Sequence, residues 1–410
     1  MKSLLFLFRM VIAVTFIFSG FVKAVDPIGF ALKIEEYLIA MRMDWLSVIT
    51  LPSAIGLIAV EFLLGFYLLI GFYVRKMMPI LLIVMAGFTI LTFYTAVFNP
   101  VSDCGCFGDA VKISNWETFW KNVVLMAFTG TMFYYRKLFN DASCNNIKMY
   151  VSAVLGAVYV IGLSIYCYNN LPIIDFRPYK IGTNIASQMT IPPDAEQPEI
   201  ETLFIMEKDG EQKIFNLNDY PYDDSTWVFV DTERVIVKDG YVPPLQDFAV
   251  FNQVSQEVTD KIVNRQGPLF LVISHQLKKA DKSSIKKFIE LGNAAKQKNI
   301  PFYCVTASGV VTADVFAHEH FAWWTYLECD ETILKTMVRS NPALLLLHDG
   351  TIAGKWHFKN IPDKEIMNNP LAYSIQELTY KNRQLIIWVN IFITILIIVL
   401  FVNHNKKVKK

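Results

Sequence analysis

The sequence predicts a multi-domain membrane protein: an α-helical transmembrane bundle and an extracytoplasmic α/β domain that follows a β-rich segment. Only 18% of the 410 residues are charged, whereas soluble globular chains carry about 25%. Six segments are apolar over about 20 residues, the helix length that crosses the hydrocarbon core. One long hydrophilic stretch, residues 169–384, contains alternating strand-like and helix-like patterns, which predict an α/β fold. The net charge of +1 gives no field that would favour a nucleic acid partner.

The predicted spans have an almost uninterrupted apolar composition. They run over residues 3–22, 49–73, 77–98, 118–135, 149–168 and 385–403. The fourth is the weakest, because Lys121 and Asn122 lie in its first turn. The first could instead be a cleaved signal peptide, but Val22-Lys23-Ala24 is a poor cleavage site.

The distribution of basic residues predicts the orientation. Basic residues gather at both ends of the chain and in two short connections: Lys2, Arg75, Lys76, Arg136, Lys137, Lys148, Lys406, Lys407, Lys409 and Lys410. The opposite loops, 23–48 and 99–117, are richer in Asp and Glu. We therefore expect a multi-pass membrane protein in contact with lipid. Both termini would be cytoplasmic, and residues 169–384 would lie on the opposite side of the membrane.

The hydrophilic stretch divides into two parts. Residues 169–265 form a linker and a β-rich segment, in which 196–241 are either a small β subdomain or an extension of the following sheet. Asp209-Gly210 between alternating runs indicates a hairpin turn. Residues 266–380 contain buried strand patterns interleaved with helices, and a closing hairpin turns at 348–350. This alternation predicts a parallel core sheet with an antiparallel closing hairpin.

A resemblance comes from the string YLECDETILKTMVRSNPALLLLHDGTIAGKW. It is similar to the C-terminal half of a thioredoxin-like domain of the TlpA or peroxiredoxin type. The resemblance implies that Pro342 is the cis-proline that opens a core strand. Such domains carry Cys-x-x-Cys or one reactive Cys after the first core strand, where this chain has no thiol in residues 274–278. We therefore expect a thioredoxin-like fold that lacks the chemistry and acts as a docking module.

The string Cys104-Gly105-Cys106 is the most informative motif, and it lies in the outside loop between the third and fourth spans. Two thiols at an oxidising membrane surface are a candidate disulfide or dithiol. A Cys-x-Cys ring is strained, and strained bridges are the labile ones. A static bridge and a metal site are the alternatives, although two sulfurs without a further His or Cys pair make a weak zinc site. The supporting residues around the pair are Asp103, Gly105, Phe107, Gly108 and Asp109.

The charges next to the pair bear on its resting state. We expect Asp103 and Asp109 to raise the pKa of the thiols by like-charge repulsion, with Lys112 opposing them. This field favours a resting disulfide that waits for a client's thiolate.

The first 140 residues carry the second resemblance. The strings FRMVIAVTFIFSGFVKAVDPIGFALKIEEY and NPVSDCGCFGD, together with Glu61 in the second span, resemble the DoxX-like family and its MauE-type branch. The resemblance implies a four-helix membrane domain over residues 1–140, followed by a fifth span at 149–168 and a last span at 385–403. It also implies a bacterial inner-membrane protein, with residues 169–384 in the periplasm. Finally, it implies disulfide chemistry on secreted proteins and an outline similar to quinone-linked thiol oxidases, so that a quinone is the cofactor it allows.

Two charges lie within predicted spans, Arg9 and Glu61. Ionisable groups at membrane depth are functional candidates. They form either a mutual ion pair that fixes helix register or a polar site for a quinone or a proton path. We expect Cys144, Cys167, Cys304 and Cys329 to have no redox role, and His318 and His320 to be solvated rather than metal ligands.

Two functions of different classes follow. The first is a thiol–disulfide oxidoreductase in which Cys104 and Cys106 exchange with a periplasmic thiol protein or a partner oxidoreductase. The second is a redox-inert scaffold whose periplasmic domain binds a partner. The sequence does not identify the client or the direction of electron flow.

Overall fold

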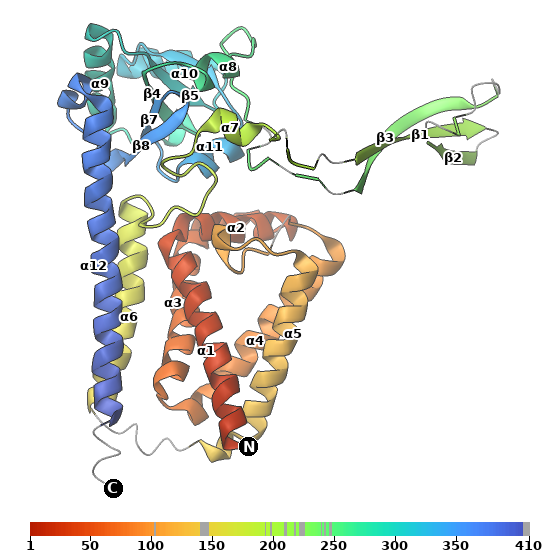
Figure 1. The fold of residues 1–410 in the computed structure, drawn as a ribbon, viewed down its shortest axis with the longest axis vertical. Coiled ribbons are helices and arrows are strands. Elements are labelled where there is room, and N and C mark those ends of the chain that lie inside the picture. The colour runs from red at the N-terminus through yellow and green to blue at the C-terminus, as the bar shows by residue number, and fades with distance from the viewer. Residues whose placement is uncertain are drawn as a thin grey trace.

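The computed structural model describes residues 1–101, 104–139, 147–192, 194–196, 199–208, 211–216, 219–220, 226–238, 240–241, 243–245 and 248–404. Figure 1 shows a helical bundle below an α/β unit, and a β arm that projects away from both. The N-terminus and the end of the last helix lie at the same end of the bundle, opposite the α/β unit (Figure 1).

The bundle is built from long apolar helices with one helix lying across their outer ends. The helices are α1 (Lys2–Val25), α2 (Pro27–Ala40), α3 (Thr50–Ile70), α4 (Val74–Phe98), α5 (Asn115–Tyr134), α6 (Ile147–Asn169) and α12 (Pro370–His404), with the short 3-10 turns η1 (Asp44–Ile49), η2 (Gly108–Ala110) and η3 (Arg136–Leu138). The crossing helix is α2 (Figure 1). The sequence predicts a loop over residues 23–48, which include this helix. The helix forms because Asp26 caps it by accepting a hydrogen bond from the Gly29 amide at 2.9 Å, and because Pro27 fits the first turn.

Four helices in the described part of the chain are long and apolar enough to cross a membrane: Lys2–Val25, Asp44–Ile70, Val74–Phe98 and Met149–Asn169. They correspond to predicted spans one, two, three and five. The other two predicted spans fall on α5 and α12. α5 packs beside α4, with the rings of Phe93 and Phe119 5.4 Å apart, and α12 runs along α6, where the rings of Tyr159 and Trp388 are 5.9 Å apart.

Two glycines let α1 and α3 approach backbone to backbone. A Cβ built on Gly20 would lie 2.7 Å from the Phe62 Cβ, and one on Gly65 would lie 2.7 Å from the Ile17 amide nitrogen. Small residues at such crossings are the usual means of close helix packing in membranes. This approach brings the outer half of α1 against Glu61 of α3.

The α/β unit is a mixed five-stranded sheet, as the alternating pattern predicted. Its order is β6-β5-β4-β7-β8, in which β4, β5 and β6 are parallel and β7 is antiparallel to both β4 and β8. The strands are β4 (Pro268–Ser274), β5 (Phe302–Thr306), β6 (Thr325–Glu328), β7 (Ala343–His348) and β8 (Thr351–His357). The Asn341-Pro342 peptide bond before β7 is cis.

Helices cover both faces of this sheet. One face of β4, with Leu269 and Leu271, packs in a core with α11, α8 and α7, while Phe270 and Val272 on the other face pack with α9 and α10. These helices are α7 (Ile185–Met189), α8 (Thr259–Val263), α9 (Ile285–Gln297), α10 (Val310–His320) and α11 (Glu331–Met337), and the remaining 3-10 turns are η5 (Leu277–Lys279), η6 (Phe358–Asn360) and η7 (Lys364–Asn368). In the view of Figure 1, α11 lies on the side of the sheet that faces the bundle.

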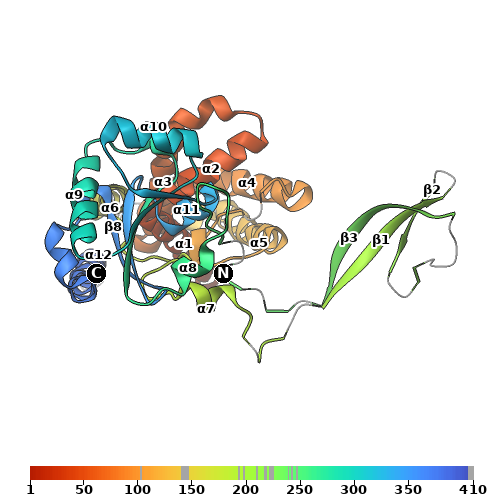
Figure 2. The same cartoon turned by 90° about the horizontal axis from the view of Figure 1, so that it is seen from above.

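The β-rich segment is a separate antiparallel sheet. Its strands β1 (Glu199–Lys208), β2 (Glu211–Phe215) and β3 (Val228–Lys238) are arranged in the order β2-β1-β3. They form an arm well away from the core sheet (Figures 1 and 2), so the alternative of an extension of that sheet is wrong. The predicted turn residues, Asp209 and Gly210, lie outside the described residues.

The close packing of α1 and α3 yields a stability prediction. Gly65→Ala should destabilise the protein by about 1–3 kcal/mol, because the new methyl group overlaps backbone atoms that cannot move aside. Gly56→Ala is the matched control in the same helix, since a Cβ there meets nothing within 4 Å; we expect no loss, and a gain of up to about 1 kcal/mol. Thermal unfolding in detergent measures both. Equal melting temperatures for the two variants would contradict the packing argument.

Candidate functional site

The two cysteines of the motif lie together at the outer end of the bundle, in residues 104–109, named here the CGC loop. Their Sγ atoms are 2.7 Å apart and hydrogen-bonded to each other. Gly105 makes this possible, because its φ of +66° turns the chain between the cysteines in a conformation that favours glycine. Cys104 is buried and Cys106 half-buried. Asp103 lies outside the described residues.

Side chains from three helices hold the loop in place. The Tyr37 hydroxyl of α2 donates to the Cys104 carbonyl at 3.2 Å, and Ser19 Oγ of α1 lies 2.6 Å from the Cys106 carbonyl oxygen. The Phe107 ring packs against Phe18, and Lys121 Nζ of α5 lies 4.2 Å from the centre of the Phe107 ring. The loop is therefore anchored on both sides of the cysteine pair.

The environment favours a thiolate on Cys104. A hydrogen bond from the Cys106 side chain is the main cause that lowers the pKa of Cys104, to about 6, and Thr118 and Lys121 also lower it against the effect of burial. The pKa of Cys106 is raised by the same shared hydrogen bond, by burial and by the Cys104 charge. For Cys104, the expectation that neighbouring carboxylates raise the thiol pKa is thus wrong, because hydrogen bonds decide the outcome.

Glu61 is paired with Lys23 rather than with Arg9, and the proposed mutual ion pair of Arg9 and Glu61 is a prediction that the structure corrects. Lys23 Nζ lies 2.7 Å from Glu61 Oε2, and Ser19 Oγ lies 2.7 Å from Glu61 Oε1. Lys23 and Glu61 are only 5% and 6% exposed. Ser19 and Lys23 are one turn apart on α1, so both face Glu61 across the contact with α3. The same serine reaches the CGC loop.

Arg9 lies too far along α1 to join this network. It is ten residues before Ser19, which corresponds to about 15 Å along a helix. Its guanidinium carbon lies 5.1 Å from the centre of the Phe6 ring, and its buried Nε has no hydrogen-bond partner among the described residues.

A second ionic contact, named here the Arg339 clasp, joins the α/β unit to the bundle. Arg339 Nη2 lies 2.9 Å from Asp26 Oδ2 and 3.4 Å from Asp109 Oδ2. Burial alone would raise the pKa of Asp26, but Arg339 and Arg177 hold it below its usual value. Burial raises the pKa of Asp109 despite Arg339. One guanidinium therefore ties the residue after α1 and the end of the CGC loop to the segment between α11 and β7.

Further charges are buried where the linker meets the α/β unit. Asp175 is bonded by Arg177 at 2.7 Å and by Lys355 at 2.9 Å, and these cations hold its pKa far below the usual range despite burial. Lys355 also donates to the Met337 carbonyl at 2.7 Å. Burial lowers the pKa of Lys355 to about 8 even though Asp175 opposes this.

Residues 274–278, which follow the first core strand and contain no cysteine, are instead hydrogen-bonded to Asn341. Ser274 Oγ donates to the Asn341 side-chain oxygen at 2.8 Å, and the Asn341 amide donates to the Gln276 carbonyl at 2.9 Å. The cysteines outside the CGC loop do not pair in the described residues: Cys167, Cys304 and Cys329 are buried and free. Cys144 lies outside the described residues. Within the part that the structure describes, no three His, Cys, Asp or Glu side chains gather as a metal site.

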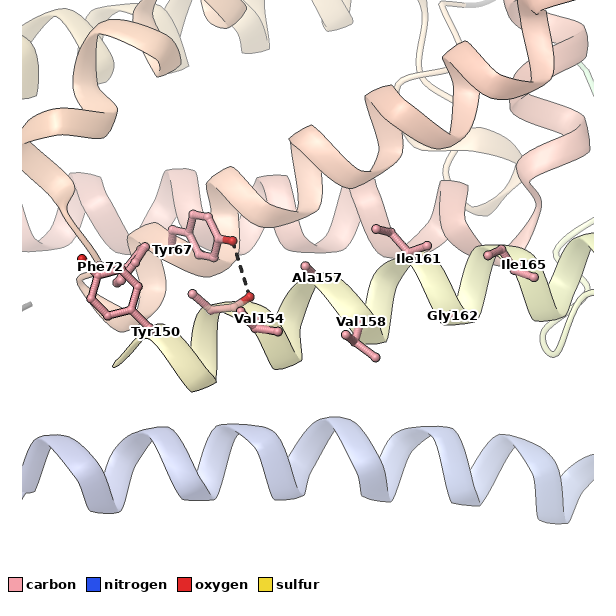
Figure 3. A pocket seen from close by; sticks show the side chains of 10 residues that line it. Tyr67, Phe72, Tyr150, Val154, Ala157, Val158, Ile161, Gly162 and Ile165 are labelled. Carbon is pink, nitrogen blue, oxygen red and sulfur yellow. Dashed lines mark hydrogen bonds between the residues drawn. The ribbon is translucent and has the colours of Figure 1, made fainter. Parts of the chain in front are cut away.

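An apolar groove of ≈ 610 Å³ runs along α6, with Tyr67 of α3 at one end (Figure 3). Its walls are aromatic and small aliphatic side chains, including Tyr67, Tyr150 and Ala157. Tyr67 donates a weak hydrogen bond to the Ala153 carbonyl at 3.4 Å (Figure 3). No residue of the CGC loop lines the groove, so it is separate from the thiol chemistry.

The buried Lys23–Glu61 pair predicts a strong dependence on both partners. Lys23→Met should cost about 3–5 kcal/mol, because it leaves an uncompensated buried carboxylate. The double variant with Glu61→Met should recover much of that loss. Lys335→Met is the control, since its i,i+4 pair with Glu331 is partly exposed and should be worth at most about 1 kcal/mol. Additive losses in a double-mutant cycle by thermal unfolding would refute the coupling.

The hydrogen bond to Cys104 predicts a pH signature. In the reduced protein, thiolate absorbance near 240 nm, taken as the difference from Cys104→Ser, should rise with a midpoint near pH 6. Because Cys106 is the main cause of the low value, Cys106→Ser should move that midpoint upward by at least one pH unit. A midpoint in the ordinary range of cysteine, about 8.5, in the parent would overturn the assignment.

Comparison with known protein families supports a membrane domain at the N-terminus. Residues 1–135 match the family model described as methylamine utilisation protein MauE, and residues 200–239, in the arm, match a domain of unknown function, DUF8463. No curated protein and no solved structure gives a match. The first match covers α1 to α5 with the CGC loop, the Lys23–Glu61 pair and Asp26. The chain therefore carries an N-terminal MauE family domain and is a multi-pass membrane protein.

Proposed function

We propose that this protein is a membrane-bound thiol–disulfide oxidoreductase that acts on extracytoplasmic thiols through Cys104 and Cys106. The observation that supports it most is the contact of the two sulfurs, 2.7 Å apart, in an anchored loop that favours a thiolate on one of them. Labile cysteine pairs lie in such surroundings, whereas structural cysteines are inert. The family name of residues 1–135 refers to methylamine utilisation, so a client in that process is one candidate.

The proposed exchange conserves atoms and electrons. The Cys104 thiolate attacks a client disulfide, and a mixed disulfide forms as one client sulfur leaves as a thiolate. Cys106 transfers its proton to that sulfur and attacks the Cys104 sulfur, which releases the client with one thiol and one thiolate and leaves the Cys104–Cys106 disulfide. Two electrons pass from the pair to the client. The reverse sequence oxidises a client dithiol, and Lys121 and Lys23 favour the Cys106 thiolate in either direction.

The setting of this chemistry is also part of the proposal. The excess of Lys and Arg at the termini supports a bacterial inner membrane with residues 169–384 in the periplasm, as does the common location of the N-terminus and the end of α12 (Figure 1). The strand order supports a thioredoxin-like unit over 266–380, and the lack of a thiol in residues 274–278 supports a unit that docks without reacting. A membrane quinone is the class of cofactor that would exchange electrons with the pair.

The mechanism predicts a trapped intermediate. Cys106→Ser should form a mixed disulfide at Cys104 that cannot be resolved, seen by mass spectrometry of the intact variant as an added mass, protein or small thiol, that reductant removes. Cys104→Ser is the matched control and should trap several-fold less, because the pKa of Cys106 is raised. The double variant should carry no such adduct and should still insert in the membrane.

The competing function is a redox-inert scaffold. It predicts that Cys106→Ser traps nothing and that the double variant matches the parent in every disulfide assay of the host. That pair of results would replace the redox proposal.

A further inference from the structure

A cavity of ≈ 780 Å³ lies between the CGC loop and the α/β unit. Gly105, Gly108 and Asp109 of the loop form one wall, α2 forms another, and Thr332 and Thr336 of α11 lie on the opposite side. Gly105 directly precedes Cys106, and Gly108 follows it after Phe107, so the loop on both sides of this cysteine borders the cavity, while Cys104 and Cys106 themselves lie behind that wall. Lys23, which stabilises the Cys106 thiolate, also lines the cavity. The cavity therefore lies directly beside the thiol pair.

The size and cover of the cavity limit what can enter. Pockets of about 300–1,000 Å³ hold small molecules, whereas a folded protein needs an open face of several hundred Å² per partner. The α/β unit covers the CGC loop, and the Arg339 clasp fixes this cover to both Asp26 and Asp109. A folded protein could reach the loop through this opening only after the clasp had opened.

The walls of the cavity carry charges of both signs. Lys112 and Lys335 line it together with Glu35 and Glu36. Arg177, only 2% exposed, places a further positive charge within the wall. Glu36 and Lys335 are already paired, with Lys33 and Glu331. Lys112 and Arg177 therefore suit a carboxylate inside the cavity, and Glu35 suits an ammonium group.

We infer that this cavity is the substrate site and that it takes a low-molecular-weight zwitterionic thiol or its disulfide. The inference rests on the proposed thiol–disulfide function and specifies its substrate class. The α/β unit then acts as a selective cover for the pair. A folded protein dithiol is the alternative substrate, and the experiment below separates the two.

Thiol–disulfide exchange of the full chain in lipid nanodiscs tests this inference, with oxidised glutathione and with a folded protein disulfide as substrates of the reduced protein. The parent should react with glutathione at least tenfold faster than with the folded protein. Thr336→Trp places an indole in the cavity and should slow the glutathione reaction about tenfold. Thr312→Trp on α10, a half-buried threonine outside the cavity, is the control and should stay within twofold of the parent.

If Thr336→Trp lowers the melting temperature strongly, Thr332→Trp at the exposed end of α11 replaces it, with an expected loss of about threefold. Unchanged glutathione exchange in the cavity variant that folds, or a parent that prefers the folded protein, would overturn the cavity as substrate site and leave the redox function standing. A parent that reacts with neither substrate would overturn both.

Discussion

The ion pair of Lys23 with Glu61 is the constraint on which the functional end of the bundle depends. Two charges buried in a membrane bundle are tolerated only when they are paired and hydrogen-bonded, so α1 and α3 must meet at one register. Gly20 and Gly65 allow that meeting because they remove side chains where the backbones touch. Ser19 positions the CGC loop relative to this ion pair, since it contacts both Glu61 and the Cys106 carbonyl.

The Arg339 clasp adds the second constraint. It connects Asp109, at the end of the CGC loop, with Asp26, which caps α2, and with the segment that precedes the cis bond. The CGC loop, through Asp109, and the α/β unit that covers the cavity are thus joined by the Arg339 guanidinium. A change in the loop that moved Asp109 would weaken the contact of Asp109 with Arg339 of the α/β unit, because charge-assisted contacts of arginine depend on geometry.

Local patterns predicted much of the fold. The strand over 268–274 and its parallel neighbour follow from short apolar runs between turn signals, which need only nearby residues to be recognised. The sequence does not predict the crossing helix α2, because its 14 residues are too few to span a membrane and lie in a connection between two spans. The cysteine pair was found because spacing alone identifies it, although its redox role stays a prediction.

The rest of the site could not be found in the sequence because its partners are distant along the chain. The sequence predicts Lys23 as the first residue of an outside loop, whereas α1 continues to Val25 and buries Lys23 in the bundle. Arg339 is 313 residues from Asp26, and no local pattern marks such a contact. The sign of the Cys104 pKa shift cannot be predicted from neighbouring charges, because its main cause is the hydrogen bond with Cys106, which forms only when the folded loop brings the two sulfurs 2.7 Å apart. Thr118 and Lys121, which also lower it, come from α5.

The redox state of Cys104 and Cys106 at defined potential tests the proposed thiol–disulfide function most directly. The full chain in native membranes would be equilibrated over a series of reduced and oxidised dithiothreitol ratios, and both cysteines would be alkylated and quantified by mass shift. A redox-active pair should show one two-electron transition in which the two thiols appear and disappear together. A pair that stays fully in one state across the whole series, while the buried cysteines serve as the internal reference, would contradict that function.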